Sequence, residues 1–210
     1  MFSLVYLVDI KDIFRKEEKV MSLQKEAEKI LISLSESNET SKAFFVPTTE
    51  EQLDSLRELV GDKCYKFIDF YKDYQPNNIS FLNSNITLIG IDDVLSENTE
   101  LAPGVVLSEL GIFVFAVTVG GNVVCIDTNE NTDGDPAVLL IDHSFIYFDP
   151  DDEAEIANIP SYLNEDDFDE EDFELNYENV RKFVYRIEES FVEFIKKYSM
   201  NQYDDLEKYL

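Results

Sequence analysis

The sequence has no tryptophan and only one histidine, His143, among its 210 residues. Any Ser–His–Asp or Cys–His catalytic arrangement would have to use that one side chain. Zinc sites need several histidines or cysteines, and the two cysteines, Cys64 and Cys125, are far apart and form no spaced motif. They are expected to be free, buried thiols in a reducing compartment. We therefore expect no enzymatic activity, no cofactor and no metal.

Lysine and arginine are absent from residues 73–180, a stretch that carries 25 aspartates and glutamates. The formal charge of the whole chain is −28, so most of the charge arises in this block. Nucleic acids and anionic membranes are bound through lysine and arginine, which makes both of them unexpected partners. Because like charges repel each other in a compact state, two explanations stay open. The block either steers a basic protein partner or is the solvated face of an ordinary acidic protein.

No segment approaches the roughly 20 consecutive apolar residues of a transmembrane helix. Residues 1–10, MFSLVYLVDI, are apolar, but no basic residue precedes them and no small-residue cleavage site follows, so they do not match an export signal. We expect this arm to be a strand or to dock on the core, and we expect the protein to be cytoplasmic. At this length a single domain, 1–210, is expected.

Helical periodicity marks the first third of the chain. Apolar residues recur at spacings of three and four between Val20 and Leu34, which predicts an amphipathic helix. Together with the arm, it forms an N-terminal extension over 1–45, expected to dock on a core over 46–197. Thr48 and Glu51 fit a capping box that opens a second helix, and Gly61 is a natural end for it.

A third helix is predicted over residues 64–74, CYKFIDFYKDY, which Pro76 would end. Its inward-facing residues are expected to be Tyr65, Phe67, Ile68 and Tyr71.

The centre of the sequence changes to a β pattern. Gly120-Gly121 between β-branched runs predicts a hairpin with a two-residue type I′ turn. Asn129, Asn131, Asp133 and Gly134 match the start of a calcium loop, but Leu140 replaces its bidentate glutamate, so a polar turn explains these residues. Strands are predicted over 86–91, 111–119, 122–127 and 137–149, with a turn over 128–136. The adjacent strands form an antiparallel meander.

The C-terminal part is expected to hold an acidic insert over 150–175 and a last helix over 177–198. Residues 182–187, KFVYRI, could instead be a strand, and this alternative stays open. The insert is a candidate surface for a basic partner, because acidic side chains steer association while buried aromatic rings supply affinity. Its candidate partner-binding residues are Asp151, Asp152, Glu153, Glu155, Tyr162, Asp166, Asp167, Phe168, Asp169, Glu170, Glu171, Asp172 and Phe173. The aromatic rings could equally pin the insert to its own core.

Several short motifs follow one another along the chain. They are Tyr65-Lys66-Phe67-Ile68, Gly111-Ile112-Phe113-Val114-Phe115-Ala116, Gly120-Gly121-Asn122, Cys125-Ile126-Asp127, Pro136 to His143, and Ser190-Phe191-Val192-Glu193-Phe194-Ile195. Their order and spacing resemble the SUKH superfamily, which includes fungal cell-wall-assembly regulators and bacterial toxin-immunity proteins. The resemblance covers roughly 46–197. The extension 1–45, the insert 150–175 and Gln75-Pro76-Asn77-Asn78 depart from the family's usual pattern.

This resemblance implies an α+β fold, with a mostly antiparallel sheet built around the Gly-Gly hairpin and flanked by helices. It also implies a non-enzymatic immunity protein that binds and neutralises a cognate cationic toxin domain, such as a nuclease, of a bacterial polymorphic or contact-dependent toxin system. A nuclease must be basic where it grips phosphate, so an acidic chain suits that role. The alternative is an intracellular protein-interaction adaptor of the same fold with no toxin partner.

Overall fold

The fold is α+β, as the sequence predicted. The computed structural model describes residues 45–77, 79–80, 85–149, 154–157 and 174–210. The predicted extension 1–45 therefore lies outside the described residues except for Phe45. No helix among the described residues is both long and apolar enough to cross a membrane.

The elements in chain order are β1 (Phe45–Pro47), α2 (Glu50–Val60), η1 (Asp62–Cys64), α3 (Tyr65–Phe70), β2 (Tyr74–Pro76), β3 (Ile79–Ser80), β4 (Ile86–Leu88), α4 (Ile91–Thr99), α5 (Gly104–Glu109), β5 (Ile112–Thr118), β6 (Val123–Thr132), β7 (Asp135–Ile141), β8 (Ile146–Asp149), β9 (Ala154–Ala157), α6 (Tyr177–Val180), β10 (Tyr185–Glu188), α7 (Phe191–Ser199) and η4 (Leu206–Tyr209).

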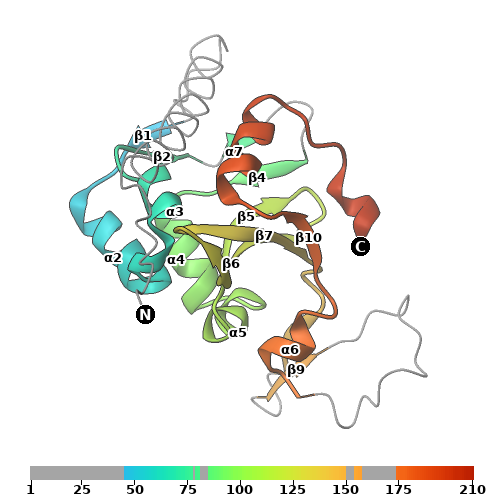
Figure 1. The fold of residues 1–210 in the computed structure, drawn as a ribbon. Helices are drawn as coiled ribbons and strands as arrows, with labels where there is room; N and C mark the ends of the chain where they lie inside the picture. The colour runs from blue at the N-terminus through green and yellow to red at the C-terminus, as the bar shows by residue number, and fades with distance from the viewer. Residues whose placement is uncertain (1–44, 78, 81–84, 150–153, 158–173) are drawn as a thin grey trace, which may run out of the picture.

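A six-stranded antiparallel sheet forms the centre of the molecule, with the strand order β10-β7-β6-β5-β4-β3. Two further antiparallel pairs, β1 with β2 and β8 with β9, lie outside it. Helices α4 and α5 pack against β5, whereas α3 and α7 pack against β7. In Figure 1, α2 to α5 gather to the left of and below the central strands, and α7 lies above them.

The predicted meander is confirmed, because β5, β6 and β7 are consecutive neighbours in the sheet. Its two turns differ from the prediction. The link after β5 spans residues 119–122, closed by the Thr118 N–H donating to the Asn122 carbonyl at 2.8 Å. Only Gly121 has a positive φ there, so it is not a type I′ turn. That geometry instead occurs at Asp133-Gly134, where φ is 54° and 77°, and the predicted long turn over 128–136 was wrong.

A buried asparagine explains how β5 accommodates an irregularity in its register between Val114 and Ala116. The Asn98 side chain accepts a hydrogen bond from the Val114 N–H at 2.8 Å and donates to the Val114 carbonyl at 2.9 Å. It thereby takes the place of a neighbouring strand at the one point where the ladder breaks. This contact also fixes α4 against β5.

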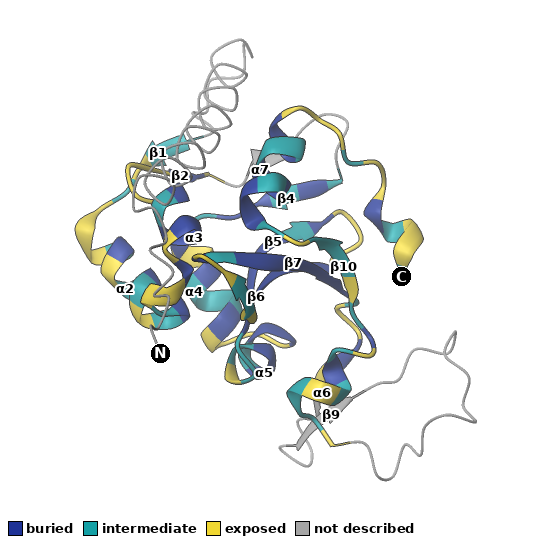
Figure 2. Cartoon of the chain, viewed as in Figure 1, coloured by how far each residue is buried: buried dark blue, intermediate teal, exposed yellow. Residues whose placement is uncertain are grey.

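Interlocking aromatic rings form the core where α3, α7 and β5 meet. Phe191 of α7 contacts Phe67, Phe70 and Phe115 edge-on, with ring centroids 5.0, 5.6 and 5.4 Å apart. Edge-to-face pairs stabilise a core beyond their buried area. Figure 2 shows β5 and β7 buried along most of their length and β6 buried over its first half, while α2 presents one exposed face.

The second helix begins one residue later than predicted. Thr49, not Thr48, is its N-cap, and Gln52 completes the capping box. The predicted end at Gly61 is confirmed.

The third helix is shorter than predicted and ends at Phe70, because Tyr74–Pro76 pairs with β1 as a strand. Phe67, Ile68 and Tyr71 are buried as predicted, but Tyr65 is 41% exposed. Its ring lies over Gly134, where an added Cβ would come within 2.0 Å of it.

The predicted last helix over 177–198 was wrong, and the alternative strand over part of 182–187 was correct. Residues Tyr185–Glu188 pair with β7 at the edge of the sheet, between the short helix α6 and α7. Ser190 caps α7, and Asp135 accepts hydrogen bonds from the Ser190 hydroxyl at 2.7 Å and the Val192 N–H at 3.1 Å. The apolar residues keep a helical spacing through α6, β10 and α7, although the helix is interrupted, because the buried residues of all three elements face the same core.

The chain beyond residue 197 also belongs to the core. Leu206 is 2% exposed, and the Glu207 carboxylate accepts hydrogen bonds from the Gly120 N–H and the Asn122 side-chain amide. The C-terminal η4 is thereby fastened to the turn between β5 and β6.

Candidate functional site

The sequence placed the partner surface in the acidic insert, and most of its residues lie outside the described residues. Glu155 is the exception, in β9, where it stands opposite Phe148 in the pairing with β8. The other predicted residues, Asp151, Asp152, Glu153, Tyr162, Asp166, Asp167, Phe168, Asp169, Glu170, Glu171, Asp172 and Phe173, are all among the undescribed residues.

The chain that follows the insert is fixed to β6 by a buried ionic network. Asp127 is fully buried, and its Oδ2 accepts a hydrogen bond from the Tyr177 hydroxyl at 2.9 Å. The Arg181 Nε lies 3.7 Å from the same oxygen, and Arg181 also donates to Glu130 at 2.7 Å. Burial and the hydrogen bond to Asp127 raise the pKa of Tyr177 to about 12. The network is structural, because its groups are satisfied by one another.

A groove between α2, α4 and α5 is the candidate binding site. The two longer helices are tied together at their N-terminal ends, where Gln75 donates to Gln52 at 2.8 Å and accepts from the Ile91 N–H at 2.7 Å. Gln52 in turn donates to Asp92 at 3.0 Å. The groove is lined by side chains from the later turns of both helices, by the end of α5 and by β5.

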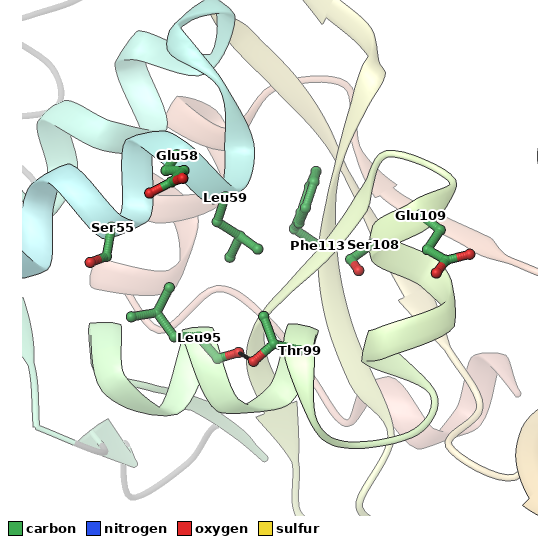
Figure 3. Close-up of a pocket in the computed structure, with 8 residues that line it drawn as sticks. All are labelled: Ser55, Glu58, Leu59, Leu95, Thr99, Ser108, Glu109 and Phe113. Atoms are coloured by element: carbon green, nitrogen blue, oxygen red, sulfur yellow. Dashed lines mark hydrogen bonds between the residues drawn. The ribbon is translucent and has the colours of Figure 1, made fainter.

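The floor of the groove is apolar. Leu59 of α2, Leu95 of α4 and Phe113 of β5 point toward one another across a space of about 540 Å³ (Figure 3). Leu59 and Leu95 are half-buried, whereas Phe113 is almost covered. Apolar side chains left partly exposed in a concavity can bury a complementary group of a ligand. The complete lining is Ser55, Glu58, Leu59, Leu95, Thr99, Ser108, Glu109 and Phe113.

The hydroxyl groups of the groove are already engaged by their own helices. Ser55 donates to the Glu51 carbonyl at 3.0 Å, Thr99 to the Leu95 carbonyl at 2.8 Å and Ser108 to the Val105 carbonyl at 2.8 Å. The remaining polar side chains, Glu58 and Glu109, are exposed and have no hydrogen bond or ion pair with a described residue. Two carboxylates without a partner in the described part of the chain therefore lie at opposite edges of an apolar floor.

The electrostatics of the groove favour a cation. The C-terminal turns of α2 and α4 carry partial negative charge. The one basic residue of α2, Arg57, is occupied by Asp54 at 2.7 Å.

His143 lies outside any catalytic arrangement among the described residues. It was predicted inside a strand over 137–149, but the strand breaks into β7 and β8, and His143 occupies the exposed turn between them. Its Nδ1 lies 3.0 Å from the Asn122 side-chain oxygen. No group of three or more His, Cys, Asp or Glu side chains that could hold a metal ion occurs in the described part of the chain. Both cysteines are free and buried, as predicted.

Comparison with known proteins adds no relative: no family model matches the chain, and neither a curated protein nor a solved structure matches it at a significant level. The SUKH resemblance therefore stays a prediction from the motifs.

The groove was not predicted, because no helix or strand was expected over residues 92–110, which hold most of α4 and all of α5. The signal was present in part. Leu95 follows Ile91 and Val94 at helical spacing, and Asp92 and Asp93 are typical of a first helical turn. Which of these apolar residues faces a groove rather than the core depends on how α2 and α4 cross, and one sequence does not specify this.

Proposed function

We propose that this protein is a non-enzymatic binding protein that occludes a basic protein partner. In its specific form, it is a cytoplasmic immunity protein that neutralises a cationic toxin domain, such as a nuclease of a bacterial polymorphic or contact-dependent toxin system. The observation that carries the proposal is the absence of lysine and arginine from residues 73–180, beside 25 acidic residues. The motif order that resembles the SUKH superfamily supports the specific form.

A physical argument supports this proposal: so many acidic residues without lysine or arginine between them destabilise the folded chain when no partner is bound. Clustered carboxylates repel one another, and their field attracts cationic partners and accelerates association. Basic residues outside the block supply some counter-charge. Arg181 and Arg186 both bind Glu130 on β6. Glu58 and Glu109, in contrast, receive no counter-charge from a described residue.

A growth-protection assay tests the specific form. The gene next to the one that encodes this chain is examined for a large secreted protein with a basic C-terminal domain. That domain is expressed in cells with and without this chain, and binding is measured by calorimetry with the purified proteins. We expect a stable complex and restored growth. A toxic basic neighbour that neither binds this chain nor is neutralised by it would refute the immunity role, and a non-toxic basic partner would favour the adaptor.

The acidic segment contributes a separate kinetic prediction. Neutralising Asp166, Asp167, Glu170 and Glu171 with asparagine and glutamine should slow association with the basic partner and leave dissociation nearly unchanged, because charges at an interface rim act on the association rate. The effect should shrink as salt shortens the Debye length from about 10 Å at 0.1 M to about 3 Å at 1 M. An association rate indifferent to both changes would exclude electrostatic steering by this segment.

A further inference from the structure

We propose that the groove between α2, α4 and α5 binds an amphipathic segment of the basic partner, with a bulky apolar side chain on Leu59, Leu95 and Phe113 and a lysine or arginine at Glu58 and Glu109. This inference rests on the proposed function, since it names the surface and the segment through which the basic partner is held. It differs from the sequence prediction, which placed the contact in the insert 150–175.

The apolar half of the inference follows from the floor. Leu59 and Leu95 are half-buried and converge on Phe113 across about 540 Å³. A space of this size accommodates one or two large side chains of a peptide, and most ligand pockets combine such a floor with a few placed polar groups. Interfaces gain most of their affinity where one apolar anchor is buried centrally.

The cationic half follows from what the edges of the groove offer. The serine and threonine hydroxyls already donate to their own helices. Among the lining residues, Glu58 and Glu109 supply the carboxylates, and an ionised carboxylate can only accept hydrogen bonds, which a lysine or arginine can donate. The C-terminal ends of α2 and α4 add negative potential at the same place. Charge complementarity therefore selects a partner segment with lysine or arginine beside its apolar anchor, and disfavours an acidic one.

A designed peptide tests the proposed binding at the groove without the need for a toxin. The probe is a hexapeptide with two leucines between pairs of lysines, titrated into the full-length protein at about 0.1 M salt. One comparison peptide replaces both leucines with serine, and another replaces the lysines with glutamate. We expect the leucine–lysine peptide to bind at least about tenfold more tightly than either comparison peptide, because only it satisfies both the floor and the edges.

Protein variants then locate the binding. Leu95→Gln should weaken binding of the probe about tenfold through faster dissociation, and Glu58→Gln with Glu109→Gln should slow its association a few-fold. The matched control is Asp73→Asn with Glu178→Gln, two exposed acids without a side-chain partner among the described residues, which should leave the affinity within about twofold. The edge substitutions are at exposed positions, so they test the groove even if Leu95→Gln disturbs folding.

Three results would overturn the inference. The first is equal binding of the probe by the wild type, the groove variants and the control, which would mean unspecific attraction to an acidic protein. The second is that the wild type does not bind the probe, either because the groove has no affinity for it or because residues 1–44 of the same chain occupy the groove. The third is that the wild type forms a concentration-dependent dimer and the groove variants do not, which would mean that a second copy of the chain occupies the groove. Each outcome is independent of toxin neutralisation, which could still succeed through another surface.

Discussion

Replacing Arg181 should destabilise the protein strongly, because it would leave a fully buried carboxylate without its counter-charge. Asp127 is 0% exposed and the Arg181 side chain only 18%, with the Nε 3.7 Å from Oδ2. At an effective dielectric constant of about 20, a charge pair at this distance is worth about 4 kcal/mol. Breaking a buried pair on one side costs about 3–5 kcal/mol in other proteins. We therefore expect Arg181→Met to lower the free energy of unfolding by about 3 kcal/mol or more.

Urea unfolding followed by circular dichroism measures this loss. Three further variants are measured in the same way: Lys182→Met, Asp127→Asn, and Asp127→Asn combined with Arg181→Met. Lys182→Met is the matched control, since Lys182 is exposed and its ammonium group donates to the side chain of the neighbouring Asn179; it should change stability by less than about 0.5 kcal/mol. The double variant Asp127→Asn with Arg181→Met removes both charges and leaves an acceptor for the Tyr177 hydroxyl. It should be more stable than the sum of the single losses predicts, by roughly 1–3 kcal/mol. A loss below about 1 kcal/mol for Arg181→Met, or strictly additive losses, would refute the role of this pair.

Two further predictions follow from single positions. Gly134→Ala should destabilise the protein more than Gly121→Ala: both glycines lie in hairpin turns with positive φ, 77° and 90°, but an added Cβ would come within 2.0 Å of the Tyr65 ring at Gly134 and no closer than 3.8 Å to the His143 ring at Gly121. Strain alone costs about 1–2 kcal/mol, so equal losses in thermal unfolding would contradict the close packing at Gly134. Burial raises the pKa of the Cys64 thiol to about 11 and that of Cys125 well above its usual value. At about pH 8 both thiols should therefore stay protonated and resist a thiolate-specific reagent until the protein is denatured; rapid labelling of the folded protein would contradict their burial.

The β meander could be predicted because its signals are local. Runs rich in β-branched residues flank Gly120-Gly121, and strands joined by short turns pair with their neighbours in sequence. What the sequence did not specify is the strand that joins from far away. Tyr185–Glu188 pairs with β7, although the surrounding apolar spacing reads as a helix, because the free edge of β7 offers hydrogen bonds that no local preference encodes. The turn types were predicted wrongly for a similar reason: the register between the paired strands decides which glycine needs a positive φ.

The candidate site was less accessible to prediction than the fold. Charge drew attention to the insert 150–175, where acidic residues are densest. The groove instead depends on a tertiary relation: Gln75 and Gln52 tie α2 and α4 together at their N-terminal ends, and this sets which side of each later turn stays open. A leucine at position 59 or 95 looks the same in sequence whether it faces the core or a concavity.

The placement of the basic residues decides which part of the acidic charge is free to act on a partner. The C-terminal arginines return to the sheet, where Arg181 and Arg186 meet Asp127 and Glu130 on β6, so part of the sequence's acidic block is neutralised within the fold. Nothing comparable reaches Glu58 and Glu109 among the described residues. Arg181 and Arg186 thus stabilise the sheet, whereas Glu58 and Glu109, beside an apolar groove, have no counter-charge among the described residues. A binding surface for a cationic, partly apolar segment follows from that division, because uncompensated charge beside exposed apolar surface is stabilised most by a ligand that supplies both complements.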